Sequence, residues 1–212
     1  MNASRKTIER LSHYRMVLSR LSGQGVQNIY SRELAALADC TPAQVRRDLM
    51  VTGYEGNPKH GYNISELKKS LDVFFDFKGN LVAVIVGAGS LGRALIAYFM
   101  PKKTMYDIVA AFDSDMNKTG RLINGTPCFH INEMVEKLHD LKPDIALVTV
   151  PAESAQEVAL KLVKSGVSGI LNFAPVRLKV PEKVYVENID VTMSLEKVAF
   201  FSRQYREEKN NG

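Results

Sequence analysis

Residues 80–100 read NLVAVIVGAGSLGRALIAYFM, and this stretch decides the fold of the longer part of the chain. The apolar run 81–86 suits a buried strand, and the pattern G-x-G-x-x-G follows it directly, before an amphipathic helix. A glycine triplet alone is weak evidence, but one between a strand and a helix is typical of a dinucleotide-binding turn. Its glycines permit the tight turn, the approach of a pyrophosphate and close helix packing, in that order. The turn residues predicted to hold the cofactor are Gly87, Ala88, Gly89, Ser90, Leu91 and Gly92.

The next predicted strand, 108–112, ends at Asp113, which lies 21 residues past Gly92. An acidic side chain at this distance accepts hydrogen bonds from the adenosine ribose of a dinucleotide. The adjoining Asp115 adds a second acid, and no arginine stands nearby, so a ribose 2′-phosphate would be repelled. The sequence therefore predicts NADH and NAD+ as cofactors rather than their phosphorylated forms.

Beyond this point predicted helices and strands alternate, which indicates an α/β fold with a Rossmann-type doubly wound parallel sheet. Ligands of such sheets bind beyond the carboxyl ends of the strands. The residues at two of those ends are apolar, with Glu153 as the nearby charge, and predict a nicotinamide pocket, although each could equally serve loop packing. They are Val150, Pro151, Ala152, Phe173, Ala174 and Pro175.

A dehydrogenase needs a side chain placed to take or give the substrate's proton, usually His, Lys or Tyr. The strand-end loops contain no histidine, since the four histidines are His13, His60, His130 and His139. We therefore expect no enzyme activity. An NAD-dependent oxidoreductase with an added basic domain remains the alternative, and a coenzyme A-binding protein of the same fold is a third, which Asp113 disfavours.

The N-terminal part contains a second informative stretch, CTPAQVRRDLM at 40–50. Thr41 can cap a helix that starts at Pro42, and Gln44 stands where a capping box needs it. This helix follows another short helix, 31–39, after a tight turn, and the pair has the layout of a helix-turn-helix.

The second helix of the pair is amphipathic. Val45 and Leu49 share one side, whereas Gln44 and Arg47 lie opposite and Arg46 lies at the flank. Amide and guanidinium groups make bidentate contacts with adenine and guanine edges in the major groove. A solvated helix face is the alternative for an isolated arginine pair, so this interpretation depends on the helix-turn-helix around it.

Residues 51–64 contain turn signals between two short stretches of strand-like sequence, 51–55 and 61–64. They predict a hairpin, or wing, whose tip carries Lys59 and His60. Basic side chains on such a tip can reach a phosphate, although a loop lysine is more often simply solvated.

The 212 residues allow two domains, and the net charge of +5 is uneven. Residues 1–79 carry 12 Lys+Arg against 8 Asp+Glu, and residues 80–212 carry 16 against 15. The basic N-terminal part is compatible with binding double-stranded DNA. Neither a signal peptide nor a membrane-spanning run is visible, so we expect a cytoplasmic protein, and the isolated Cys40 and Cys128 predict no metal site.

Six stretches, in this order, resemble the Rex family of bacterial redox-sensing transcriptional repressors, and the likeness covers nearly the whole chain. They are LSHYRMVLSRL, SRELAALADCTPAQVRRDL, VGAGSLGRAL, VAAFDSD, VTVPAESAQEVA and ILNFAPVRL. The resemblance implies a repressor that binds inverted-repeat operators and leaves them when NADH rises. It also implies a homodimer with a winged-helix DNA-binding domain at 1–78, an NAD(H)-binding Rossmann domain at 79–192, and a C-terminal helix at 193–212 exchanged between subunits.

The resemblance further implies a switch in which Arg15, Tyr98 and the partner's Asp190 exchange polar contacts as the nicotinamide arrives. Two departures from the family pattern affect the predicted sites. Residues 50–62 read MVTGYEGNPKHGY where the family commonly has SYFGEFGKRGVGY, and Ala174 stands where it commonly has threonine. The first departure affects the wing, and the second removes a hydroxyl near the nicotinamide.

Overall fold

The computed structural model describes residues 3–57, 59–75, 81–99 and 106–210, and divides the chain into two units, 1–78 and 79–212. The junction between the units, at residues 76–80, lies outside the described ranges.

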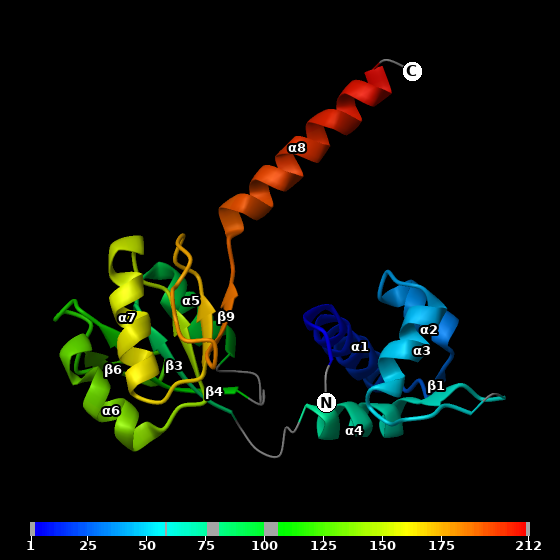
Figure 1. The fold of residues 1–212 in the computed structure, drawn as a ribbon, viewed down its shortest axis with the longest axis horizontal. Helices are drawn as coiled ribbons and strands as arrows, with labels where there is room; N and C mark the ends of the chain where they lie inside the picture. Colours follow the sequence, from blue (N-terminus) through cyan, green and yellow to red (C-terminus); the bar gives the residue numbers. More distant parts are fainter. Residues whose placement is uncertain (1–2, 58, 76–80, 100–105, 211–212) are drawn as a thin grey trace. The chain divides into compact units, whose positions relative to one another are not determined.

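The described residues of the first unit form four helices (Figure 1). They are α1 (Arg5–Gly23), α2 (Ser31–Leu37), α3 (Pro42–Met50) and α4 (Ile64–Phe74). Their apolar faces meet in one core, in which Leu11, Leu34, Val45, Ile64 and Leu67 are almost fully buried. Burying such side chains stabilises a fold by about 1.5–3 kcal/mol each. The core fixes α3 against the other helices and leaves its opposite side in solvent.

The predicted wing differs in its pairing. Strand β2 (Tyr62–Asn63) pairs with β1 (Asn28–Ile29), and not with residues 51–55. Residues 52 and 53 still donate backbone hydrogen bonds to the last turn of α3, so this stretch continues the helix as a turn. The predicted hairpin arm was therefore wrong, although a bridge between Asn57 and Gly61 closes the loop that carries Lys59 and His60.

The described residues of the second unit contain a seven-stranded sheet in the order β5-β6-β4-β3-β7-β8-β9. The strands are β3 (Leu81–Val86), β4 (Tyr106–Asp113), β5 (Arg121–Ile123), β6 (Thr126–His130), β7 (Ile145–Val148), β8 (Gly169–Asn172) and β9 (Tyr185–Asn188). All neighbours are parallel except β5, which runs antiparallel to β6. The chain reverses the strand order on either side of β3, which is the doubly wound arrangement that the sequence predicted.

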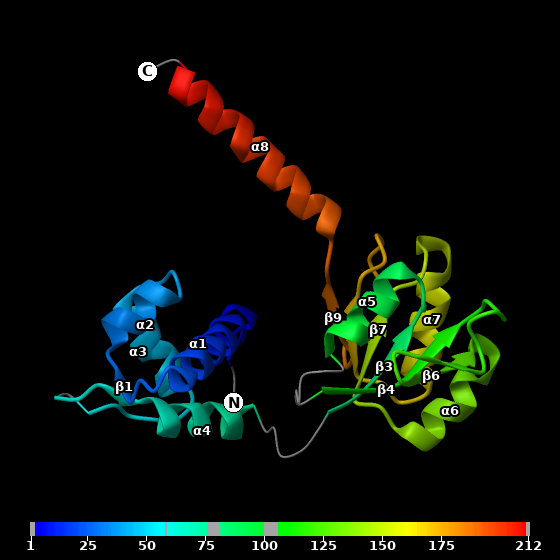
Figure 2. The same cartoon turned by 180° about the vertical axis from the view of Figure 1, so that it is seen from behind.

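Helices cover both faces of this sheet (Figure 2). Val84 and Val86 face α6 (Met134–Leu141) and α7 (Ala152–Lys164), and a short 3-10 turn (Ile131–Glu133) precedes α6. Ala83 and Ile85 face the other side, where α5 (Ser90–Phe99) packs. Because β3 is buried on both faces, it reads as a continuous apolar run.

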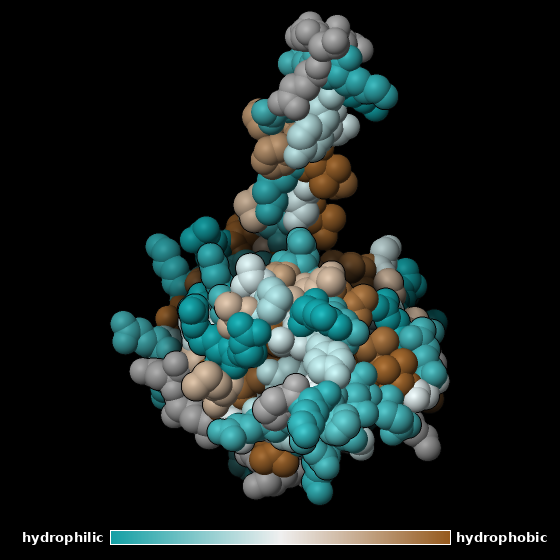
Figure 3. Space-filling model, turned by 90° about the vertical axis from the view of Figure 1, so that its right-hand side faces the viewer, coloured by the Kyte–Doolittle hydropathy of each residue, from teal (hydrophilic) through white to brown (hydrophobic). Residues whose placement is uncertain are grey.

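The last element is α8 (Val191–Asn210). Along α8 apolar and hydrophilic side chains alternate (Figure 3), and every described side chain of the helix is exposed. No helix among the described residues is long and apolar enough to cross a membrane.

Candidate nucleotide site and DNA-reading surface

The glycine-rich turn has the geometry that a close phosphate approach needs. Gly87 has a φ of +101°, and a Cβ there would stand 2.7 Å from the Thr149 carbonyl oxygen. A Cβ on Gly92 would stand 2.0 Å from the Gly87 carbonyl oxygen, so only glycine lets α5 lie this close to β3. The space beside Gly89 is open. Each glycine therefore has the surroundings expected from its place in the motif.

The sequence did not single out Thr149. Its hydroxyl lies 2.7 Å from the Gly87 carbonyl oxygen and 3.1 Å from that of Val86, and can donate its hydrogen to either. This side chain ties the end of β7 to the glycine turn, 62 residues earlier in the chain.

Asp113 ends β4 and faces the turn. Its Oδ2 accepts the Ala88 N–H at 2.7 Å, and its Oδ1 accepts the Asp115 N–H at 2.9 Å. The side chain is 9% exposed. Two backbone N–H groups thus fix this carboxylate beside the glycine turn.

A cation joins this group. The Lys118 ammonium lies 3.1 Å from Asp113 Oδ2 and 3.5 Å from Asp115 Oδ2. Hydrogen bonds from Asn117 lower the pKa of the Asp115 carboxyl, and Lys118 adds to this effect. The sequence interpretation considered only the absence of arginine and missed this lysine. Two carboxylates and one ammonium still leave one net negative charge, so the argument against a ribose phosphate holds.

A cleft of about 660 Å³ opens beside these groups. It contains the turn, the acids and two of the predicted nicotinamide residues, Val150 and Pro151, and Lys161 also lines it, 2.7 Å from Glu157. Ala152 begins α7, and Phe173 packs on the side of the sheet that α5 covers. The predicted apolar pocket is thus only partly assembled around this cleft.

The loop after β8 is shaped by a buried amide that the sequence interpretation passed over. Asn172 is fully buried, its Oδ1 accepts the Ala174 N–H, and its Nδ2 donates to the Val176 carbonyl and to Asn188 Oδ1. These bonds fix residues 173–176, which contain Ala174 at the position that departs from the family pattern. The described residues include no cluster of three or more potential metal ligands, and both cysteines are free thiols.

Only half of the capping box predicted at the start of α3 is present in the first unit. The Thr41 hydroxyl accepts the Gln44 N–H at 3.2 Å, but the Gln44 side chain does not return to cap Thr41. Its Nε2 instead donates to Asp48 Oδ1 at 2.8 Å, so the predicted capping box was wrong. The bond to Asp48 is stronger than a neutral cap bond would be, because its acceptor is a charged carboxylate one turn further along the same helix.

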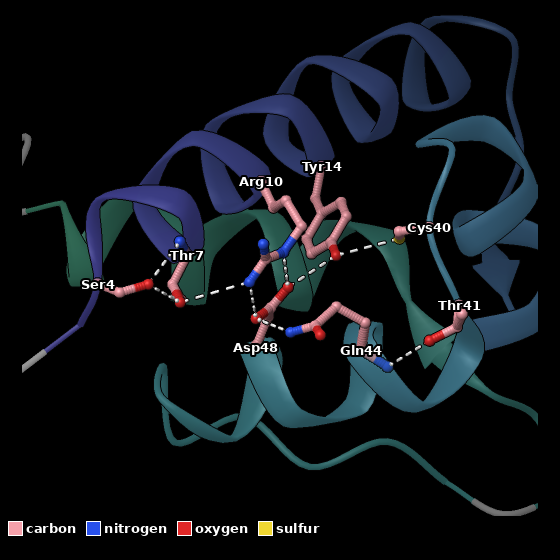
Figure 4. A network of polar contacts seen from close by, with 8 residues as sticks. All are labelled: Ser4, Thr7, Arg10, Tyr14, Cys40, Thr41, Gln44 and Asp48. Carbon is pink, nitrogen blue, oxygen red and sulfur yellow. Dashed lines mark hydrogen bonds and ion pairs between the residues drawn. The ribbon is translucent and has the colours of Figure 1, made fainter.

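Asp48 is the centre of a polar network between α3 and α1 (Figure 4). Arg10 donates from Nε to its Oδ2 at 2.6 Å and from Nη2 to its Oδ1 at 2.8 Å. The Tyr14 hydroxyl donates to Oδ2 at 2.9 Å and lies 3.4 Å from Cys40 Sγ. Burial alone would raise the pKa of Asp48, but the hydrogen bonds from Arg10, Gln44 and Tyr14 outweigh it, and the pKa is lowered. Burial also raises the pKa of Tyr14, helped by its contacts with Cys40 and Asp48.

Arg46 and Arg47 are exposed on α3, and Arg46 Nη1 donates to the Ser31 hydroxyl at the start of α2. The wing tip is held by its backbone. Asn57 Oδ1 accepts the N–H groups of Lys59 and His60, and the Tyr30 hydroxyl donates to the Lys59 carbonyl. The side chains of Lys59 and His60 are exposed on a fixed loop.

The predicted switch residues have the following places. Arg15 pairs with Asp72 across α1 and α4. Tyr98 is 58% exposed on α5 with its ring against Phe99, and Asp190 Oδ1 accepts the Met193 N–H at the start of α8. The role of these three residues stays a prediction.

Two family models match the chain. The one described as "CoA binding domain" covers residues 79–176, and the one described as "Putative DNA-binding protein N-terminus" covers residues 2–49. A relative from Carboxydothermus hydrogenoformans, "Redox-sensing transcriptional repressor Rex", is 40% identical over 198 residues, or 93% of this chain and 95% of the relative.

Solved structures of RSP, a Rex-family repressor, resemble the whole chain. The complex of RSP with beta-NAD+ and operator DNA has a TM-score of 0.90 and 30% identity, covering 99% of this chain and 97% of that one. The complex of RSP with beta-NADH has a TM-score of 0.87 and 30% identity, with all of both chains covered.

Proposed function

The chain belongs to the Rex family of redox-sensing transcriptional repressors, and from this premise we propose how its own residues bind operator DNA and release it when NADH binds. The observation that carries the proposal is the presence, in one chain, of a glycine turn with an anchored Asp113 and of a helix that exposes Arg46 and Arg47. RSP has been solved with NAD+ and operator DNA together and also with NADH, which supports the same pair of ligands here.

For the cofactor, we assign the pyrophosphate to the turn at 87–92 and the adenosine ribose to Asp113. Backbone N–H groups at the start of α5 attract the negative pyrophosphate. The nicotinamide end is assigned to Val150, Pro151, Ala152 and Phe173, which would close around the ring from two strand ends. An apolar pocket disfavours the charged ring of NAD+ more than the neutral ring of NADH, because burying a charge carries a desolvation cost.

For DNA, the exposed side of α3 enters a major groove and the wing contacts the backbone. Arg47 lies on the side of α3 opposite the core and reads a base edge, whereas Arg46, hydrogen bonded to Ser31 at the flank, serves a phosphate. Lys59 and His60 reach a phosphate from the fixed loop. Gln44 reads a base from the same side of the helix as Arg47.

We propose that the protein works as a cytoplasmic homodimer. One helix-turn-helix reads one half-site, so an inverted repeat needs two copies. All described side chains of α8 are exposed, and the large apolar or aromatic ones among them are Val191, Met193, Leu195, Val198, Phe200, Phe201 and Tyr205. The sheet also has an apolar hollow beside α5, lined by residues that include Phe99, Ile108, Ile145 and Tyr185. Exchange of α8 between subunits would cover such surfaces, and Asp190 at the start of α8 would then meet Arg15 and Tyr98 of the other subunit.

An enzyme that shares the fold is the alternative, because the cleft contains two lysines that sequence reasoning did not place there. Lys118 is paired with Asp113 and Asp115, and Lys161 is paired with Glu157, so both side chains already have carboxylate partners in the cleft. We therefore propose binding without catalysis.

One titration tests the proposed function. The full-length protein is mixed with a labelled inverted-repeat duplex, and NADH, NAD+ or coenzyme A is added. We expect NADH to dissociate the complex at concentrations where NAD+ and coenzyme A do not. Dissociation by coenzyme A alone would favour the ligand named in the matching family model, and turnover of NADH in the same mixture would favour an enzyme.

A further inference from the structure

The Gln44 side chain is held in one orientation by its neighbour. An amide has a donor end and an acceptor end of nearly the same shape, and its partners decide which end points where. The partner of Gln44 is Asp48, 2% exposed, which accepts two hydrogen bonds from Arg10 and one from Tyr14 as well. An ionised carboxylate only accepts hydrogen bonds, so the NH2 end of Gln44 must face Asp48.

The oxygen end is therefore turned away from the network (Figure 4). Among the described residues no buried side-chain oxygen or nitrogen lacks a partner. Gln44 Oε1 has no donor in the network of Figure 4, and Gln44 is only half-buried, so this oxygen reaches solvent. Gln44 and Arg47 are three residues apart and occupy neighbouring positions on the helix surface.

We propose that Asp48 sets the base preference of the recognition helix by fixing the amide of Gln44 with its oxygen toward the DNA. This inference rests on the proposed role of α3 in the major groove. An outward carbonyl oxygen accepts a hydrogen bond from the N6 amino group of adenine or the N4 amino group of cytosine, and it repels guanine O6 and thymine O4. The second N–H of the Gln44 amide stays available for adenine N7, so an adenine suits both ends.

Asp48 is thus a positioning residue that touches no base. Its bonds to Arg10 and Tyr14 connect the preference to α1, because the carboxylate cannot turn without breaking contacts to that helix. Removing one partner of a buried pair leaves the other uncompensated, which is costly and holds the carboxylate in this arrangement. A purely structural Asp48 would affect the fold of the unit without altering which base is preferred.

The test starts from duplexes that the full-length, unmodified protein enriches from random DNA. In the best duplex each adenine is replaced singly by purine, which lacks N6, and each cytosine by 2-pyrimidinone, which lacks N4. We expect one position per half-site where removing the amino group weakens binding by about 5- to 150-fold. The variant Gln44→Met, which keeps the side-chain length, should lose sensitivity at that position only.

The variant Asp48→Asn tests whether Asp48 sets the orientation of the Gln44 amide. An asparagine both donates and accepts, so the Gln44 amide can turn over, and the preference for an amino group over a carbonyl at that base should fall by about fivefold or more. Asp39→Asn makes the same chemical change on an exposed residue in the turn before α3 and should leave the preference unchanged. An unchanged preference in folded Asp48→Asn overturns the inference. If this variant does not fold by circular dichroism, the base that Gln44→Met ceases to prefer decides which end of the amide faces the DNA.

The possible results distinguish a protein that does not bind DNA from one in which Gln44 does not read the base. Failure of the unmodified protein to enrich any sequence contradicts the proposed DNA binding itself. Enrichment with the same analogue profile in the unmodified protein and in Gln44→Met overturns this inference and leaves DNA binding intact. A lost preference for guanine or thymine in Gln44→Met also overturns it, because that base would need the opposite end of the amide.

Discussion

Asp113 and Asp48 are both largely buried, but different hydrogen-bond donors surround them, and this decides what each carboxylate can still bind. Asp113 is held chiefly by backbone N–H groups, which leaves it beside an open cleft, whereas Asp48 is surrounded by side chains of two helices. Backbone donors fix a carboxylate without occupying all of its lone pairs. Asp113 can thus still accept a ligand hydroxyl, while Asp48 can serve only its own neighbours.

Asp113→Ala should raise the Kd for NADH by about 10- to 150-fold, because hydrogen bonds to a charged group contribute about 1.5–3 kcal/mol. The difference between NADH and NADPH should narrow, since the variant keeps Lys118 but loses one of the two repelling carboxylates. Calorimetric titration of both cofactors measures this. Asp113→Asn is the control for the shape of the turn, because it removes the charge but retains an oxygen for the Ala88 N–H. Equal affinity of the unmodified protein for NADH and NADPH would contradict the assignment.

The lowered pKa of Asp48 makes the first unit sensitive to acid. In the unfolded chain an aspartate has a pKa of about 3.9, and in the folded chain its pKa is lower. The stabilisation is complete above the unfolded pKa and is lost as the pH falls through the folded pKa. Urea unfolding of the full chain from pH 7 to 3, followed by a probe in residues 1–78, should show stability falling only below about pH 4. Asp48→Asn should lower stability at pH 7 and flatten this acid limb, and an unchanged limb would argue against the network.

Whole elements were the part of the structure most open to prediction from sequence. Three elements were predicted from local signals: α1 from its periodicity, α3 from its cap and β3 from its apolar run. Each of them lies at the predicted position in the structure. The partners were not local. The paired residues of β1 and β2 are 33 and 35 positions apart, and Arg10 and Asp48 are 38 positions apart, so no short window of sequence contains both members. The short strands β5 and β9 also escaped prediction because their stability comes from neighbours in the sheet.

In the candidate sites, too, local signals could be predicted from sequence and long-range partners could not. The glycine turn could be predicted from spacing because two of its glycines, Gly87 and Gly92, meet backbone of the adjacent strand end or of the turn itself, while the space beside Gly89 is open. Lys118 and Thr149 approach the site through the fold of separate loops, and a lysine or threonine in a loop carries no local signature. Gln44 was assigned a cap because its spacing from Thr41 fits one, but the buried charge of Asp48 competes more strongly.

On the recognition helix, Arg47→Ala should weaken specific DNA binding by about 1–3 kcal/mol and relax the preference at one base pair. Arg46→Ala should weaken binding to all sequences more evenly, because its guanidinium lies at the flank beside Ser31. Fluorescence anisotropy with the selected duplex and with an unrelated duplex distinguishes the two effects. Intact affinity and preference in Arg47→Ala would show that α3 is not the reading helix.

For α8, the full-length protein should have the mass of a dimer in light scattering, and Phe201→Glu should shift it toward the mass of one chain. A buried phenylalanine contributes about 1.5–3 kcal/mol, and a glutamate in its place adds the cost of burying a charge. Arg206→Gln, on the same helix, is the matched control and should remain dimeric. A monomeric mass for the unmodified protein would rule out the exchanged helix.

The whole molecule joins two binding sites in one chain, and thermodynamics relates them without reference to a pathway. If NADH weakens the affinity for operator DNA by some factor, operator DNA must weaken the affinity for NADH by the same factor. A ligand shifts the protein between two forms only by as much as its affinities for them differ. NADH and NAD+ differ only at the nicotinamide, so the difference between the two forms must be sensed at that ring.

We therefore predict that saturating operator DNA raises the Kd for NADH by about 5- to 150-fold, the usual size of such coupling, and changes the Kd for NAD+ much less. Ala152→Asp places a carboxylate at the start of α7, beside Val150 and Pro151, where it would favour the positively charged ring. This variant should bind NAD+ better relative to NADH and should keep its DNA when NADH is added. Titrating both cofactors with and without the duplex measures all four affinities. An NADH affinity unaffected by DNA would remove the basis for the release mechanism, while an unchanged preference for NADH in Ala152→Asp would show that the charge of the ring is read elsewhere.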